Sequence, residues 1–217
     1  MSVDAKTKIA RRAAREIQAG QVINLGIGIP TLIPSFLPPG LPLTMHSENG
    51  IIGAGTISAP GKADRNLIDA GGTYITVVPG ASFCDSVLSF SLVRGGRLDV
   101  SFLGALEVSQ QGDLANWIIP GKFAPGIGGA MELAQKARRL IITTTHATRK
   151  GEPKILRSCT LPLTARACVD LIITELAVIS VQPDGLVLEE IATETELETV
   201  LQLTEAPLVV GSTLKRF

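Results

Sequence analysis

The segment Ser47-Glu48-Asn49-Gly50 contains the residues of this chain best suited to covalent chemistry. It follows a short apolar segment and precedes two isoleucines and two further glycines, so it forms a turn after an expected strand. Open α/β sheets place ligand sites at the carboxyl ends of their strands, where Glu48 would lie. Asn-Gly is also an ordinary turn dipeptide, and a glutamate there can cap a nearby helix. Glu48 is therefore either a functional carboxylate or part of a structural turn.

A second glycine-rich segment, residues 120–132, contains Gly126, Gly128 and Gly129. These glycines precede an expected helix that begins near Ala130, and backbone amides at the start of a helix attract negative charge. Glycines in such a loop can also serve close packing alone. A carboxylate nucleophile needs nearby N–H donors that hold an oxyanion, so the two glycine segments together are more informative than either one.

Other familiar catalytic patterns are missing from the sequence. There is no phosphate-binding G-x-x-x-x-G-K-[ST] segment, and the Gly26-x-Gly28 pair is followed by Thr31 where a dinucleotide fingerprint requires glycine. There is also no G-x-S-x-G and no H-E-x-x-H. The two histidines, His46 and His146, are far apart in the chain, so we expect no histidine-rich metal site and no bound metal.

Length and composition indicate one globular domain over residues 1–217. Apolar residues make up 45% of the chain, and 20 basic residues balance 20 acidic ones, so no electrostatic footprint for nucleic acid exists. The three scattered cysteines form no C-x-x-C pair, which argues against a disulfide framework and fits a reducing cytoplasm. The charged N-terminal segment is unlike a secretory signal, and no run of about 18 apolar residues suggests a membrane span.

Short apolar segments alternate with helical patterns along the chain, which is typical of an α/β fold. Strands that are apolar throughout imply a sheet covered on both faces by helices, so we expect a three-layer αβα arrangement around an open, largely parallel sheet. Glycine-rich turns lead from strand to helix. The expected strands are 21–25, 74–78, 99–103, 140–144, 171–174, 177–181 and 186–188, and the expected helices are 4–20, 31–37, 85–93, 130–137 and 194–203.

Some boundaries follow from individual residues. Asp4 is expected to cap the first helix, and Thr193 with Glu196 has the spacing of a capping box for the last one. Pro79-Gly80 is expected to end the strand 74–78. Five basic residues of the first helix share a polar face that either meets solvent or contributes to binding an acidic partner or a phosphate: Lys6, Lys8, Arg11, Arg12 and Arg15.

The sequence resembles the B (beta) subunit of the family I coenzyme A transferases. Ser47-Glu48-Asn49-Gly50-Ile-Ile-Gly is similar to the active-site signature of that family, with His46 where the signature allows His or Gln. The resemblance extends from Ala5 to beyond Ile191 and is closest to the 3-oxoacid CoA-transferases of the acetoacetate or 3-oxoadipate type. Its other motifs are Asn24-Leu-Gly-Ile-Gly-Ile-Pro30, Leu114-Ala-Asn-Trp-Ile-Ile-Pro-Gly-Lys122, Gly128-Gly-Ala-Met131, Pro162-Leu-Thr164 and Ile173-Thr-Glu-Leu-Ala177.

The resemblance implies a CoA-transferase or NagB-like fold and a ping-pong reaction in which Glu48 is the nucleophile. The ionised carboxylate attacks the thioester carbonyl of the donor, expected to be succinyl-CoA, and expels the CoA thiolate. That thiolate attacks the resulting mixed anhydride, which gives a glutamyl-CoA thioester and releases the donor acid. An acceptor such as a 3-oxo acid then reverses the sequence. Coenzyme A is therefore a substrate, and no permanently bound cofactor is expected.

The resemblance also implies roles for other residues. The backbone amide of Gly129, with room provided by Gly128, would hold the reacting oxygen, and Asn24 would lie near the nucleophile. Asn24 could instead tie down the turn at Gly26, and Asn49 could be a left-handed turn residue. A dry site is expected to be lined by Ile27, Ile29, Ile51 and Ile52. Binding of CoA and substrate is expected at Gly26, Gly28, Ser47, Asn49 and Gly50.

The family's beta subunit works with an A (alpha) subunit, usually as α2β2 or a larger multiple, and exposed apolar surface would mark that interface. The other ligands implied are an acyl-CoA and a carboxylic acid. Two alternatives stay open: an acyl-CoA hydrolase on the same scaffold, and a non-catalytic ligand-sensing domain of related fold.

Overall fold

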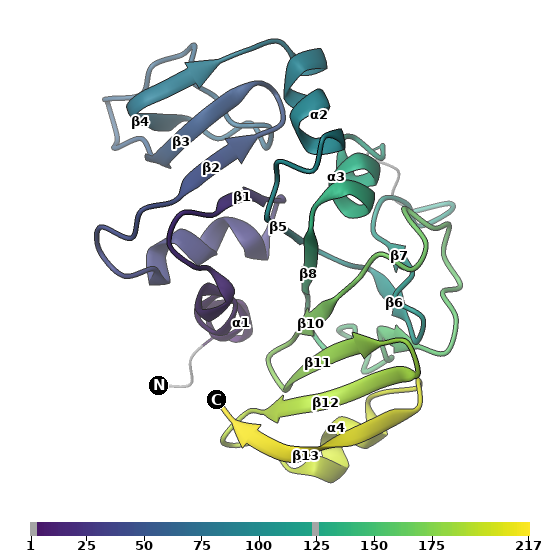
Figure 1. Ribbon diagram of the computed structural model, residues 1–217. Helices are drawn as coiled ribbons and strands as arrows, with labels where there is room; N and C mark the ends of the chain where they lie inside the picture. The colour runs from purple at the N-terminus through teal and green to yellow at the C-terminus, as the bar shows by residue number, and fades with distance from the viewer. Residues whose placement is uncertain (1–3, 123–125) are drawn as a thin grey trace.

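Ten strands form one mixed sheet in the order β13-β12-β11-β10-β8-β5-β1-β2-β3-β4 (Figure 1). The computed structural model describes residues 4–122 and 126–217. A second, three-stranded sheet has the order β7-β6-β9. The strands are β1 (Val22–Leu25), β2 (Thr44–Ser47), β3 (Ile51–Ile57), β4 (Ile75–Phe83), β5 (Val100–Leu103), β6 (Glu107–Ser109), β7 (Leu114–Ala115), β8 (Arg139–Thr143), β9 (Ile155–Leu156), β10 (Leu171–Ile173), β11 (Ala177–Gln182), β12 (Gly185–Ile191) and β13 (Leu208–Arg216).

The centre of the large sheet is parallel. Strands β10, β8, β5, β1 and β2 all run in the same direction, whereas β3 and β4 extend one side as antiparallel strands. On the other side β11 is antiparallel to β10, and β12 is antiparallel to β11 but parallel to β13. The prediction of an open, largely parallel α/β sheet is confirmed, with antiparallel pairs at both edges.

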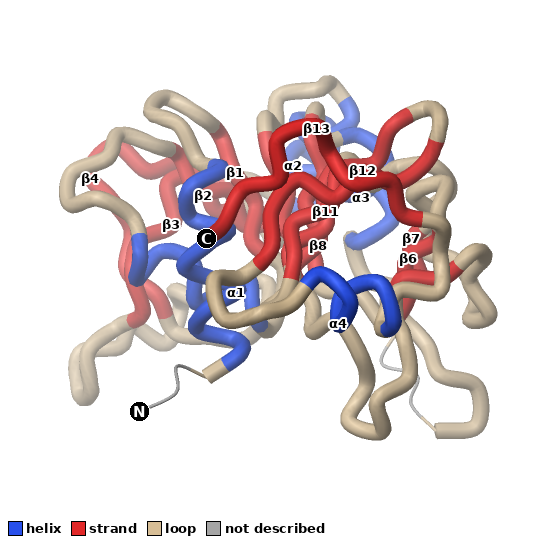
Figure 2. Tube along the Cα trace, turned by 90° about the horizontal axis from the view of Figure 1, so that it is seen from below, coloured by secondary structure: helices blue, strands red, loops and turns tan. Residues whose placement is uncertain are grey.

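Helices cover both faces of this sheet (Figure 2). They are α1 (Ala5–Ala13), α2 (Ser86–Arg94), α3 (Ala130–Lys136) and α4 (Leu197–Gln202), with the 3₁₀ segments η1 (Ala14–Glu16) and η2 (Ile29–Phe36). One core lies between the sheet and α1, η1 and η2, and the other lies under α2, α3, α4 and the small sheet. No helix in the described ranges is long and apolar enough to cross a membrane.

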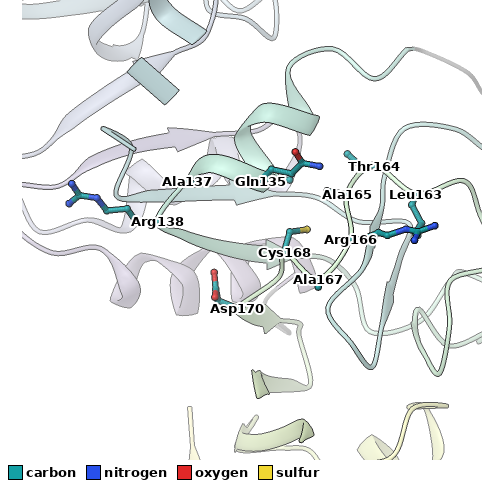
Figure 3. Close-up of a pocket in the computed structure, with 11 residues that line it drawn as sticks. Gln135, Ala137, Arg138, Leu163, Thr164, Ala165, Arg166, Ala167, Cys168 and Asp170 are labelled. Carbon is teal, nitrogen blue, oxygen red and sulfur yellow. The ribbon is translucent and has the colours of Figure 1, made fainter. Parts of the chain in front are cut away.

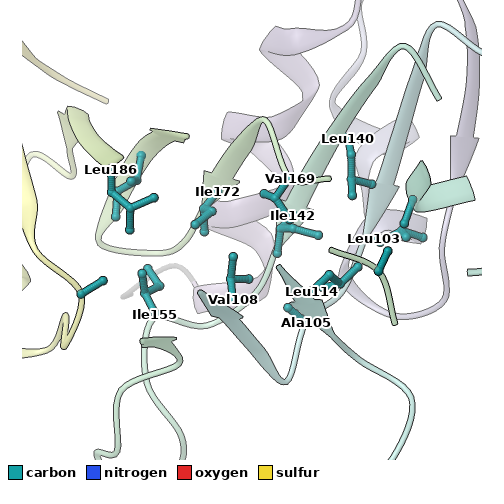
Figure 4. Packing of buried hydrophobic residues seen from close by; sticks show 14 of the residues in the cluster. Leu103, Ala105, Val108, Leu114, Leu140, Ile142, Ile155, Val169, Ile172 and Leu186 are labelled. Carbon is teal, nitrogen blue, oxygen red and sulfur yellow. The ribbon is translucent and has the colours of Figure 1, made fainter. Parts of the chain in front are cut away.

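Strand β5 shows how these two cores are formed from one sequence segment. Phe102 packs among the residues of α1 and η2, whereas its neighbour Leu103 belongs to the core on the opposite face. Successive side chains of a strand point to opposite faces, so a strand buried on both sides must be apolar throughout. In Figure 4, Ile142 and Ile172 of the large sheet face Val108 of the small one. This pattern explains why the central strands could be predicted from apolar runs.

Several predicted boundaries are wrong. Strand β4 continues through Pro79 and Gly80, because β4 is an edge strand and a missing N–H costs little there. The segment after Gly28 forms a 3₁₀ helix, η2, with Pro34 inside it, rather than the α-helix expected over 31–37. Proline lacks the N–H that an α-helical turn needs at this position.

The predicted helix caps also differ from the structure. Within the described residues the Asp4 side chain makes no capping bond to α1. The Thr193 hydroxyl donates to the Phe217 carbonyl at 2.9 Å, so it serves the C-terminal strand rather than a capping box. Helix α4 consequently begins at Leu197, later than expected.

Arg12 of α1 does not meet solvent, because its side chain is only 7% exposed. It donates to both carboxylate oxygens of Glu190 on β12 at 2.8 Å and to Glu16 at 2.7 Å. These hydrogen bonds from Arg12 hold the pKa of Glu190 below its ordinary value. The ion pair therefore joins α1 to the C-terminal part of the sheet.

Replacing Arg12 by Met should lower the free energy of unfolding by about 3 kcal/mol at pH 7, because the partly buried carboxylate of Glu190 loses its ion-pair partner. The pKa of Glu190 is lower in the folded than in the unfolded protein. The ion pair therefore stabilises the fold at a pH above the unfolded-state pKa of Glu190, and this stabilisation is lost as the pH falls through its folded-state pKa. Urea unfolding at pH 7 and pH 3 should show the Arg12→Met difference shrinking in acid. Lys6→Met, at an exposed position of α1, should change stability by less than about 0.5 kcal/mol. An equal Arg12→Met difference at both pH values would contradict this account.

Candidate active site

Glu48 follows directly after β2, at the carboxyl end of a parallel strand, as expected. Its neighbour strand β1 places Asn24 opposite His46. The Asn24 amide nitrogen donates to Glu48 Oε2 at 3.0 Å and to the His46 carbonyl at 3.1 Å. Asn24 is 1% exposed, so this donor is held by the sheet rather than by solvent. One buried side chain thus orients the carboxylate of Glu48.

The second glycine segment reaches the same place. A Cβ built on Gly129 would lie 3.4 Å from Glu48 Cγ, so the segments that carry Glu48 and Gly129 are in contact although 81 positions separate them. The same Cβ would lie 2.7 Å from Cζ of Phe90 on α2. Gly129 is the N-cap residue of α3. Glycine is therefore needed here for space, since Phe90 and Glu48 close the site from two sides.

The Ser47–Gly50 turn is fixed by contacts of each residue. Gly50 has φ +115°, and a Cβ there would lie 1.9 Å from the Cys84 carbonyl oxygen. The Ser47 hydroxyl accepts from the Ala70 N–H at 2.9 Å, and the Asn49 amide donates to the Ile68 carbonyl at 2.7 Å. Ser47 and Asn49 thus hold the loop that follows β3. The Glu48 side chain lies instead near Asn24 and Gly129.

The remaining predicted residues lie around this centre less directly. Gly26 packs against β5, where a Cβ would meet the Leu103 side chain at 2.9 Å. Gly28 has φ +98° and begins η2, and Gly128 has φ +53° with no other described atom within 4 Å of a Cβ. Among the described residues, no hydrogen bond joins these glycines to Glu48.

The prediction that Ile27, Ile29, Ile51 and Ile52 together line a dry site is wrong. Ile27 is 74% exposed. Ile51 packs with Ala54 and Ile75 in a small core of its own, and Ile29 packs with α1. Since these side chains point to different places, they do not form one dry wall around Glu48.

Both histidines are buried, and the contact made by His46 was not anticipated from the sequence. His46 Nε2 lies 2.8 Å from the Ser89 hydroxyl of α2, and burial lowers its pKa although Glu48 nearby acts in the opposite sense. His146 lies between the hydroxyls of Thr174 and Thr204, each at 2.9 Å. Burial lowers the pKa of His146 to about 4, so it is a neutral structural residue at pH 7.

One cavity lies beside β2 and β3, and another lies beside the end of α3. One of about 340 Å³ lies between η2 and the strands β2 and β3, and Ser47, Met45 and Ile75 contribute to its wall. A shallower one of about 530 Å³ lies between the end of α3 and the segment 163–170, with Arg138 and Arg166 near its two ends (Figure 3). Glu48 lines neither of them. Within residues 4–122 and 126–217 no cluster of three or more His, Cys, Asp or Glu could hold a metal ion.

Comparison with known proteins assigns the chain to a family. Residues 6–200 match the family described as Coenzyme A transferase. The chain belongs to this family. It is 47% identical over 210 residues to a probable coenzyme A transferase subunit beta of Bacillus subtilis, and the match covers 97% of both chains. It is 45% identical over 212 residues to the acetate CoA-transferase subunit beta of Escherichia coli K12, covering 98% of this chain and 97% of the relative.

The mouse mitochondrial succinyl-CoA:3-ketoacid coenzyme A transferase 2B is also 45% identical, and the match covers 97% of this chain but 41% of that longer protein. These comparisons make the chain a beta-type subunit of a CoA-transferase, as the sequence motifs predicted.

Solved structures confirm the fold at lower identity. An acyl-CoA transferase from E. coli O157:H7 superposes with a TM-score of 0.80 at 24% identity, over all of this chain and 44% of that one. Glutaconate coenzyme A-transferase from Acidaminococcus fermentans gives a TM-score of 0.74 at 18% identity, over 100% and 89%. The decarboxylase AibA/AibB is similar as well, with a TM-score of 0.70 at 21% identity, so the fold alone does not define the reaction.

Gly129→Ala should lower kcat of the assembled enzyme about tenfold or more, because the new methyl group displaces Phe90 and contacts Glu48. Stability should fall by only about 1–3 kcal/mol, as for other overpacked sites. Steady-state assays and thermal unfolding test this. Gly104→Ala is the matched control, since a Cβ there meets no described atom within 4 Å and no positive φ is involved. Equal activity of the two variants would contradict a role for the narrow approach at Gly129.

Proposed function

We propose that Glu48 carries the acyl group and then coenzyme A during transfer of CoA between two carboxylic acids. The carboxylate attacks the donor thioester carbonyl, a C–O bond forms, and the C–S bond breaks to release the CoA thiolate. The thiolate then attacks the Glu48 carbonyl of the mixed anhydride, which releases the donor acid and leaves a glutamyl-CoA thioester. The acceptor carboxylate repeats these steps in reverse order, so the kinetics are ping-pong.

The observation that carries this proposal is the meeting of Glu48, Asn24 and Gly129 at one end of the sheet. An ionised carboxylate needs no histidine base, which suits a site where the adjacent imidazole, His46, already bonds to Ser89. Asn24 would hold one oxygen of Glu48 and leave the other free to attack. The Gly129 N–H would donate to the carbonyl oxygen as negative charge develops on it.

We further propose succinyl-CoA as donor and a 3-oxo or other short carboxylic acid as acceptor. Support comes from the relatives, whose names include acetate and 3-ketoacid transferases at similar identity. CoA enters and leaves as a substrate, and the reaction uses no permanently bound cofactor. Residues 1–217 would act as one domain, with Gly26, Gly28, Ser47, Asn49 and Gly50 shaping the binding site. The three free thiols fit the cytoplasm.

Glu48→Gln should lower kcat about 1000-fold or more and abolish the covalent intermediate, because a neutral amide is a poor nucleophile. The purified enzyme is mixed with acyl-CoA, the thioester is trapped with borohydride, and peptide mass spectrometry locates the modified residue. Glu198→Gln, an exposed carboxylate on α4, is the control and should retain activity and the adduct. An unmodified Glu48 in an active enzyme would contradict the proposal.

The same material separates the alternatives. A hydrolase would consume acyl-CoA without an acceptor acid, whereas a transferase requires the acid for turnover. A ligand-sensing domain would bind acyl-CoA with no covalent step. Formation of the acceptor's CoA thioester, only when the acceptor acid is present, therefore distinguishes the proposed transferase from both alternatives.

We propose that the partner is a CoA-transferase alpha subunit, in an α2β2 or larger assembly. Relatives of similar length are named as beta subunits, which implies a second chain for them. Large apolar side chains are exposed just after β1, at the end of β4, on α2 and on α3, which is unusual for a surface that stays in water. They are Ile27 (74%), Phe83 (61%), Val87 (71%), Leu88 (53%) and Met131 (41%). An alpha subunit seated on them would also cover Glu48.

Val87→Lys should weaken assembly with the alpha subunit about tenfold or more, because it places a charge in an apolar contact. Sedimentation velocity of the mixed subunits measures the shift. Val209→Lys is the control, since Val209 is 63% exposed but lies on β13, at the other edge of the sheet. If Val209→Lys weakens assembly and Val87→Lys does not, the interface lies elsewhere.

A further inference from the structure

Helix α2 begins in contact with the turn that carries Glu48. The Cys84 N–H, just before the helix, donates to the Gly50 carbonyl at 2.9 Å. A Cβ at Gly50 would lie 1.9 Å from the Cys84 carbonyl oxygen, so the two backbones approach as closely as glycine permits. Asp85 caps the helix by accepting from the Leu88 N–H at 2.8 Å. The first turn of α2 is therefore a well-defined element held against the catalytic turn.

One turn further along, α2 contacts the strand that precedes Glu48. Ser89 is fully buried and His46 is 6% exposed, and the Ser89 hydroxyl lies 2.8 Å from His46 Nε2. Burial lowers the pKa of His46, so the imidazole is neutral at pH 7. The contact is thus a neutral hydrogen bond between the end of β2 and α2, shielded from water.

The next residue of α2 contacts the opposite side of the site. Phe90 lies so close to Gly129 that a Cβ there would be 2.7 and 2.9 Å from two ring carbons. That Cβ position is itself 3.4 Å from Glu48 Cγ. Adjacent residues of one helix therefore touch β2 and the glycine loop, the two segments between which Glu48 must act.

We propose that the His46–Ser89 hydrogen bond positions Glu48 for reaction, by fixing β2 to the helix that also sets the Gly129 loop. His46 and Ser89 would be positioning residues, and the inference rests on the proposed role of Glu48. The His46 carbonyl accepts from the Asn24 amide that also donates to Glu48, so a shift of His46 disturbs that hydrogen bond too. A displacement of about 1 Å at a reacting group can cost about 100-fold in rate.

Two substitutions at position 46 separate positioning from mere packing. In His46→Gln the amide nitrogen is three bonds from Cβ, as Nε2 is in histidine, so it can reach Ser89. In His46→Asn the amide is one bond shorter and leaves Ser89 unpaired. In the enzyme assembled with its alpha subunit, His46→Asn should lower kcat about 100-fold with KM for acyl-CoA changed less than about threefold. His46→Gln should stay within about fivefold of the native kcat.

Ser89→Ala should resemble His46→Asn, and the double variant should lose no more than either single one, because all three remove the same interaction. The direct readout is the single-turnover rate at which the Glu48 adduct forms, with thermal unfolding to verify that each variant is folded. Native-like rates in His46→Asn, or losses that multiply in the double variant, would overturn the inference while leaving the adduct intact in the native enzyme. If the native enzyme forms no adduct at Glu48, both the inference and the proposed function fail.

Discussion

The site depends on the pairing of β1 with β2. These strands run parallel with Asn24 opposite His46, which places the Asn24 amide 3.0 Å from the carboxylate of Glu48, two residues after His46 and directly after the end of β2. A shift of one residue in this register would turn Asn24 to the opposite face, because side chains alternate along a strand. The apolar residues on either side of Asn24 prevent that shift, since Ile23 is fully buried against α1 and η2. Packing on one face of the sheet therefore fixes the polar geometry on the other.

A large part of the fold could be predicted because its central strands are buried on both faces. Strands β5, β8 and β10 are apolar runs bounded by glycine or polar residues, and α2 starts at a capping Asp85, so local sequence identifies them. The misplaced boundaries lie where tertiary structure overrides local preference. Strand β4 tolerates Pro79 because it lies at the edge of the sheet. The Thr193 hydroxyl donates to the Phe217 carbonyl instead of capping a helix. Neither circumstance is visible in the neighbouring residues.

The members of the candidate site could be proposed from the sequence, but their contacts could not. The residues of the Ser47–Gly50 turn and Gly129 carry chemical types and spacings that single them out, and family resemblance joined them. Their distances depend on crossovers of many residues, which no local pattern encodes. The His46–Ser89 contact was missed because a lone serine in an amphipathic helix resembles any other small residue, and the signal lies only in its burial.

The exposure of residues in the candidate site supports the proposal that a partner subunit completes it. Glu48 is partly exposed and Ile27 is largely exposed, whereas the proposed acyl anhydride and thioester would have to be kept from water to reach the acceptor. The predicted ring of isoleucines does not supply that shield, because Ile51 and Ile29 pack into separate cores. Under the proposed mechanism a partner subunit would exclude water from Glu48, and the exposed apolar side chains on α2 and β4 could contact that subunit. In the proposed arrangement the beta subunit would provide the nucleophile and its alignment, and the balance between transfer and hydrolysis would depend on how closely the proposed partner covers Glu48.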